Sequence, residues 1–138
     1  MTIPLWSLLG FAAWTLLLLV FTVGGYRWSR ILTARAQLSD FPADAAGGEA
    51  WYQRATRAHA NCIENLPVFG AVVLALQASG VGGTFVDSLS LSVLAARILQ
   101  SLVHVSFVQN NVVIGWRFTL FSVQAASFLV LMALIVSA

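Results

Sequence analysis

Lysine is absent from this 138-residue chain, and charged residues of every kind make up only 9% of it. Soluble domains are about 25% charged, so this scarcity excludes an ordinary soluble protein. Hydrophobic residues reach 59% and the mean hydropathy is +0.87, which indicates an integral membrane protein. The single cysteine, Cys62, cannot form an intrachain disulfide.

Several kinds of chemistry are missing as well. The formal net charge is only +2, and no basic tail or basic patch interleaved with aromatic residues is present, which argues against nucleic acid as a partner. No group of histidine, cysteine and acidic residues has the spacing of metal ligands, so we expect no metal site. Cys62 has no aligned base and is not expected to act as a nucleophile.

Long apolar runs dominate what is present. A membrane span needs about 20 residues, so the length allows four spans and short connections. We expect one all-α, four-helix transmembrane domain over residues 1–138, with helices at about 3–24, 51–78, 84–107 and 116–136. The first is expected to end at Gly24-Gly25. A cleavable signal peptide is the disfavoured alternative there, because the segment lacks a basic n-region and its apolar core is too long.

The arginines predict the orientation. Arg117 lies at the connection between the third and fourth spans, whereas the turn at 79–83 and both ends of the chain carry no basic residue. The positive-inside rule then places the charged connections in the cytoplasm and both termini on the other side, and we expect a bacterial inner membrane. The other arginines near the first connection are Arg27, Arg30, Arg35, Arg54 and Arg57.

A polar stripe marks the start of the second span. Its members fall within a helical sector of roughly 100°, and each ionisable group at membrane depth costs roughly 2.5–3.5 kcal/mol, which indicates a functional site. The stripe comprises Arg54, Arg57, Asn61, Glu64 and Asn65.

The third span carries a matching polar face. Arg97, Gln100 and His104 are spaced i, i+3 and i+7, and they should meet the stripe and Arg117 at one membrane surface. Arginines with one acidic partner suit a small anionic ligand that also carries an ammonium group. A GC-rich genome would also favour arginine, and a structural Arg97–Glu64 pair is an alternative. Arg54 and His59 fit interfacial positions better.

One segment resembles a family signature. Arg57-Ala-His-Ala-Asn61-Cys-Ile-Glu64-Asn-Leu-Pro67 is similar to the pattern Arg-Ala-x-x-Asn-x-x-Glu-x-x-Pro of the MAPEG family, membrane-associated proteins in eicosanoid and glutathione metabolism. The length, the four-helix plan and the arginine near the start of the last helix extend the resemblance over the whole chain. It implies a homotrimer that binds glutathione between neighbouring subunits. The glutathione contacts it implies are Arg57, Asn61 and Glu64, with Arg35 as a further carboxylate partner and Arg97 in the same polar cluster. From the polar face of the third span, His104 is a further candidate glutathione-binding residue.

The resemblance also implies a reaction. Arg117 would stabilise the glutathione thiolate, since a nearby guanidinium lowers a thiol pKa from about 8.5. The thiolate would attack a lipophilic electrophile held in a groove along the first and fourth helices, as in a microsomal-type glutathione transferase or peroxidase. Gln100 and His104 stand where eicosanoid members have aromatic hydroxyls, and Ala60 replaces an arginine or polar residue. The alternative is a non-catalytic lipid-binding or scaffolding member. A small transporter or an assembly subunit unrelated to glutathione is disfavoured, and for a transporter the first and fourth helices are too uniformly apolar to line an aqueous path.

Overall fold

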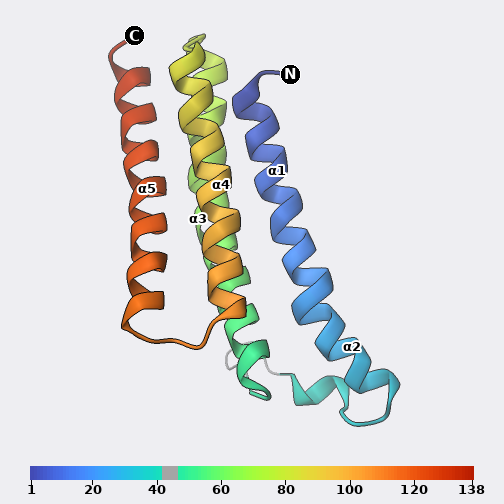
Figure 1. The fold of residues 1–138 in the computed structure, drawn as a ribbon. Coiled ribbons are helices and arrows are strands. Elements are labelled where there is room, and N and C mark those ends of the chain that lie inside the picture. Colours follow the sequence, from blue (N-terminus) through green and yellow to red (C-terminus); the bar gives the residue numbers. More distant parts are fainter. Residues whose placement is uncertain (42–46) are drawn as a thin grey trace.

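All regular secondary structure in the described residues is helical, in a computed structural model that describes residues 1–41 and 47–138. Within those residues, four helical rods are long and apolar enough to cross a membrane, which confirms the expected four-span, all-α plan. The first rod is continuous through α1 (Ile3–Leu18), η1 (Leu19–Gly24) and α2 (Gly25–Leu32). The others are α3 (Ala50–Ser79), α4 (Thr84–Ser106) and α5 (Asn111–Val136), and both termini lie at the same end (Figure 1). A short 3₁₀ turn, η2 (Leu38–Asp40), follows α2.

The expected end of the first helix at Gly24-Gly25 is wrong. The chain passes through a π-helical turn, η1, and continues to Leu32. A Cβ atom at Gly24 would lie 2.9 Å from the carbonyl oxygen of Leu19. Glycine therefore permits the close backbone approach in this π turn, and here it marks a change of helical pitch instead of a stop.

The last helix begins earlier than expected, at Asn111 rather than at residue 116. Asn110 is the N-cap, and its Oδ1 atom accepts a hydrogen bond from the Val113 amide at 2.9 Å. This cap satisfies one of the free amides at the helix start. As a result, Arg117 lies in the second turn of α5 and not at its first residue.

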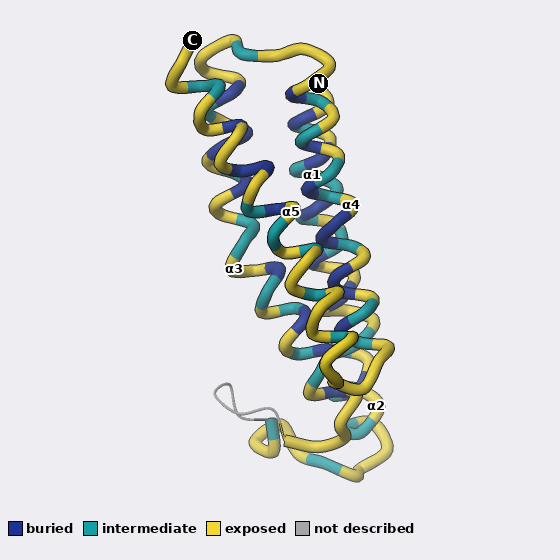
Figure 2. Tube along the Cα trace, turned by 60° about the vertical axis from the view of Figure 1, so that its left-hand side comes forward, coloured by how far each residue is buried: buried dark blue, intermediate teal, exposed yellow. Residues whose placement is uncertain are grey.

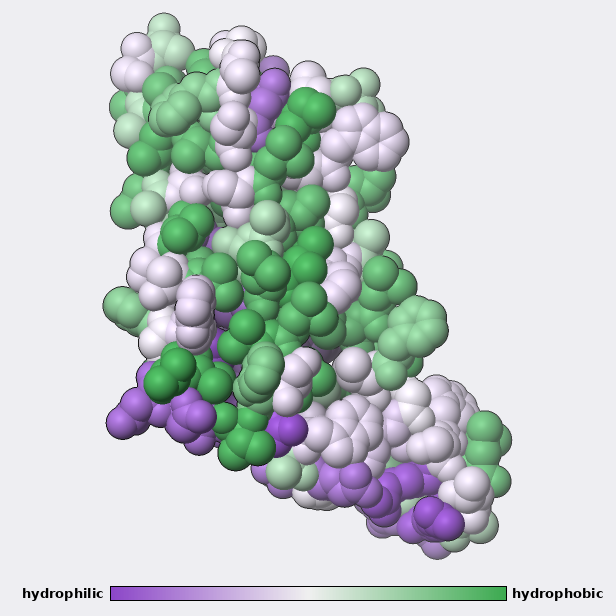
Figure 3. Space-filling view, viewed as in Figure 1, coloured by the Kyte–Doolittle hydropathy of each residue, from purple (hydrophilic) through white to green (hydrophobic). Residues whose placement is uncertain are grey.

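The packed core lies along the inner faces of the rods (Figure 2), and many large apolar side chains lie on the outer faces. Phe69 of α3 joins two other helices, because its ring centroid lies 5.8 Å from those of Phe11 in α1 and Phe128 in α5. Large apolar side chains such as Phe21 and Leu74 remain 74% and 62% exposed. Such an exterior suits hydrocarbon, and the largest hydrophilic patches gather at the end opposite the termini (Figure 3).

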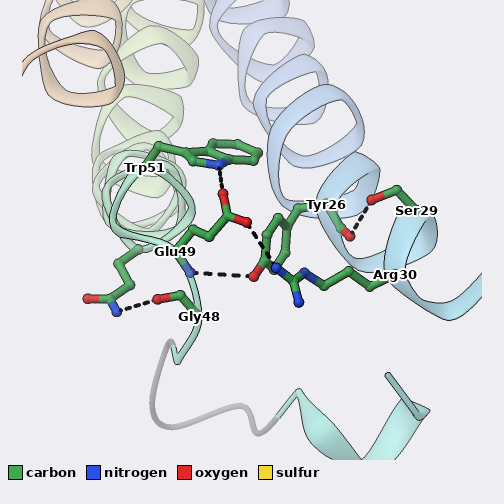
Figure 4. A network of polar contacts seen from close by, with 7 residues as sticks. Tyr26, Ser29, Arg30, Gly48, Glu49 and Trp51 are labelled. Atoms are coloured by element: carbon green, nitrogen blue, oxygen red, sulfur yellow. Dashed lines mark hydrogen bonds and ion pairs between the residues drawn. The ribbon is translucent and has the colours of Figure 1, made fainter. Parts of the chain in front are cut away.

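Contacts at that end hold the start of α3 against α2 (Figure 4). The rings of Tyr26 and Tyr52 stack with centroids 4.1 Å apart. Glu49 accepts hydrogen bonds from Arg30 Nη2 at 2.9 Å and from Trp51 Nε1 at 2.7 Å. The polar half of α3 is therefore anchored at its first turn, which sets the position of the stripe that follows.

Candidate functional site

One cavity collects most of the polar stripe of α3 and part of the polar face of α4, together with residues of α5. Its volume is about 370 Å³. The first three lining positions on α3 are spaced i, i+4 and i+7, so they project from one helix face. The lining comprises Arg57, Asn61, Glu64, Asn65, Arg97, Gln100, Gln109, Ile114, Arg117, Phe118 and Phe121. The structure thus brings together five of the residues predicted from sequence, while their ligand contacts stay predictions.

Positive charge exceeds negative charge in this cavity. The lining residues include three arginines, Arg57, Arg97 and Arg117, and one acidic residue, Glu64. Arg30–Glu49 is the only ion pair within 4.0 Å in the described part of the chain, so the alternative of a direct Arg97–Glu64 pair is not formed. The unpaired arginines leave a surplus of two positive charges, which an anionic ligand would neutralise.

Arg97 is the most deeply buried of these charges, with 1% of its surface exposed. Its Nε and Nη2 atoms have no hydrogen-bond partner among residues 1–41 and 47–138. A buried donor without an acceptor is costly, and more so when it is charged. Arg97 also lines the cavity, so a buried charge with incomplete hydrogen bonding lies in the cavity wall.

Arg117 is held through its backbone. Gln100 Nε2 donates to the Arg117 carbonyl at 3.1 Å, and Gln124 Nε2 donates to Gln100 Oε1 at 3.1 Å. Gln124 is completely buried and was missed in the sequence analysis. The signal that could have found it is a lone amide within a long apolar span, because such groups require a partner at membrane depth.

Two predicted residues lie outside the cavity. Arg35 lines a separate hollow of about 230 Å³ at the end of α2, beside Tyr26 and Tyr52. His104 is buried, 5% exposed, but it lies one helical turn beyond Gln100, past the cavity lining. Neither side chain is therefore among the residues that line the main cavity, and their contacts with a ligand stay predictions.

Arg54 and His59, the other two residues discussed with the stripe, lie away from the cavity lining. Arg54 donates from Nε to the Val105 carbonyl at 3.2 Å, near the end of α4. Neither Arg54 nor His59 belongs to the cavity lining. Arg54 thus supplies a partner for a carbonyl in the last turn of a helix, where intrahelical partners run out.

The cavity has two chemically different walls. Its polar side chains come mainly from α3 and α4, whereas Ile114, Phe118 and Phe121 form an apolar wall on α5. These three are 42%, 69% and 44% exposed, so that wall is continuous with the lipid-facing surface. Of the two helices expected to form an apolar groove, only the last contributes to this cavity in the described chain.

Comparison with known proteins gives one match. The model of the MAPEG family matches residues 3–137, nearly the whole chain. No curated protein and no solved structure matches the chain.

Proposed function

Since the chain belongs to the MAPEG family, which includes glutathione transferases and peroxidases, we propose that its cavity binds glutathione and activates the thiol. The observation that carries this proposal is the surplus of two positive charges on the lining. Glutathione has two carboxylates and one ammonium, so its thiolate form bears a net charge that neutralises this surplus. The neutral thiol would leave one guanidinium uncompensated, and the site therefore favours ionisation.

The lining residues suit different parts of the tripeptide. In this proposal Arg57 and Arg97 hold the carboxylates, because guanidinium forks pair with carboxylates in bidentate geometry. Glu64 accepts the ammonium, and the amide of Asn61 binds a peptide group. Arg117 faces the thiol and lowers its pKa from about 8.5.

The second substrate in this proposal is a lipophilic electrophile from the bilayer. It would rest against the apolar wall of Phe118 and Phe121, which is open to lipid. The thiolate sulfur then bonds to the electrophilic carbon, and the leaving group departs with the electron pair. Holding both reactants at one cavity makes the reaction effectively unimolecular.

The proposal includes assembly and orientation. A homotrimer would allow Arg35, which lines a separate hollow in its own subunit, to serve a neighbour's cavity. The end of α2, the start of α3 and the start of α5, which carry most of the arginines, lie opposite the two termini (Figure 1). The positive-inside rule puts this end in the cytoplasm, with a bacterial inner membrane as the proposed location. Glutathione would then enter from the cytoplasm and the electrophile from the membrane.

The test uses purified protein in detergent. Glutathione binding is measured by calorimetry, and thiolate formation by the absorbance difference between bound and free glutathione at neutral pH. We expect both in the wild type, whereas Arg117→Ala should bind glutathione but form no thiolate. Absence of both binding and thiolate in the wild type would overturn the proposal.

A non-catalytic member of the family is the second candidate. No hydroxyl-bearing side chain lines the cavity within the described residues, so thiolate stabilisation would depend on Arg117 alone. If the wild type binds glutathione without forming thiolate or converting any electrophile, this second candidate is the correct one.

A further inference from the structure

Gln124 is an unusual residue for its position. It lies midway along α5, a span of high hydropathy, and it is completely buried. A polar side chain at membrane depth is retained only when it finds partners. It does not line the cavity, so direct contact with a ligand does not explain it.

Its hydrogen bonds lead to the site. The Nε2 atom of Gln124 donates to Gln100 Oε1 and to the Leu120 carbonyl, both at 3.1 Å. Gln100 in turn donates to the Arg117 carbonyl at 3.1 Å. A donor from α4 thus contacts the backbone of the α5 turn that carries Arg117, and Gln124 orients that donor.

Few contacts of its own hold the guanidinium of Arg117 in place. Its Nε atom is buried without a hydrogen-bond partner in the described chain. The direction of this side chain therefore depends on the depth and rotation of its helical turn. A small displacement of that turn would move the guanidinium away from a thiol held by α3 and α4.

We propose that Gln124 is a positioning residue: through Gln100 it holds the α5 turn of Arg117 where the guanidinium can stabilise a bound thiolate. The proposal rests on the proposed function of the cavity. A purely structural role in α4–α5 packing is the competing explanation. The same interface offers a matched control, because Ser127, also buried, lies 3.1 Å (Oγ to Oγ) from Ser92 without contacting Arg117.

The experiment compares Gln124→Met, which preserves length but removes the donor, with Ser127→Ala. Gln124→Leu is the second variant should Met disturb packing. We expect Gln124→Met to keep the glutathione Kd within about threefold while the ratio of thiolate to thiol at neutral pH falls about tenfold, which is equivalent to one pKa unit. Ser127→Ala should retain the wild-type thiolate. In a Gln100→Leu background, Gln124→Met should cause no further loss, because the two amides act as one unit.

A second measurement needs no glutathione. Hydrogen exchange at residues 111–120 should become faster in Gln124→Met and stay unchanged in Ser127→Ala. Unchanged thiolate in Gln124→Met, or an equal loss in Ser127→Ala, would overturn the inference. If the wild type bound no glutathione, the proposed function would fail, and unchanged exchange at residues 111–120 would separately overturn the positioning role.

Discussion

The guanidinium of Arg97 lies over the ring of Phe11, with its Cζ atom 5.5 Å from the ring centroid. The two residues join α4 to α1, and both are almost completely buried. A desolvated cation–π contact contributes about 2 kcal/mol, whereas burying an ion costs several kcal/mol. The ring therefore offsets only part of the cost, and the unliganded protein holds Arg97 in a costly position.

Replacing Arg97 by leucine should have opposite effects on stability and on binding. The variant Arg97→Leu removes a buried charge that is only partly compensated, so the melting temperature of the unliganded protein should rise or stay unchanged. Glutathione affinity should fall about 10–100-fold, the value of a charge-assisted hydrogen bond of about 1.5–3 kcal/mol. Thermal unfolding with and without glutathione measures both. A loss of stability without a loss of affinity would make Arg97 a structural residue.

The two arginines of the α3 stripe should have different roles, one in ligand binding and the other in stability. Arg57→Ala should weaken glutathione binding about 10–100-fold, because Arg57 lines the cavity. Arg54→Ala should leave the Kd within about twofold and lower the free energy of unfolding by about 1 kcal/mol, since only its bond to the Val105 carbonyl is lost. Calorimetry on both variants decides the matter. Equal losses of affinity would show that the whole stripe, and not the cavity alone, binds the ligand.

Glu64 should recognise the ammonium group. It supplies the only carboxylate among the described lining residues, so Glu64→Gln should weaken glutathione binding about tenfold. An analogue that lacks the γ-glutamyl amine should bind wild type and Glu64→Gln with the same affinity, because it has no ammonium to lose. If the variant weakened the analogue as strongly as glutathione, Glu64 would act on another part of the ligand.

The contacts between α2 and α3 should differ widely in how much they contribute to the free energy of unfolding. The Arg30–Glu49 pair is exposed, with 35% and 55% of the two side chains accessible, and such pairs contribute about 0.2–1 kcal/mol. Tyr52 is 2% exposed and stacks on Tyr26, and removing a buried aromatic ring costs about 3–5 kcal/mol. In reversible unfolding by SDS in mixed micelles, Glu49→Gln should therefore have a small effect and Tyr52→Ala a large one. The reverse order would mean that the ion pair, and not the stacked rings, anchors α3.

Much of the candidate site could be predicted before the structure was known. The spacing of Arg57, Asn61 and Glu64 places them on one helix face in any α-helix, so their shared wall follows from 3.6 residues per turn. The helix boundaries were harder to predict. The Gly24-Gly25 pair predicts a helix end, although in the structure Gly24 lies in a π-helical turn. The N-cap of α5 is Asn110, which precedes the long apolar run from which the helix was predicted.

The amino-acid sequence by itself determined the membrane environment, the four spans and the polar faces of α3 and α4, because hydropathy and helical period are local properties. Tertiary structure decided which faces meet. It placed Arg117 in the cavity and Arg35 and His104 outside its lining, and it linked Gln124 to the Arg117 backbone through Gln100. These outcomes depend on the rotation and depth of each helix against its neighbours. Packing between segments distant in the sequence sets that rotation and depth, and local periodicity does not predict them.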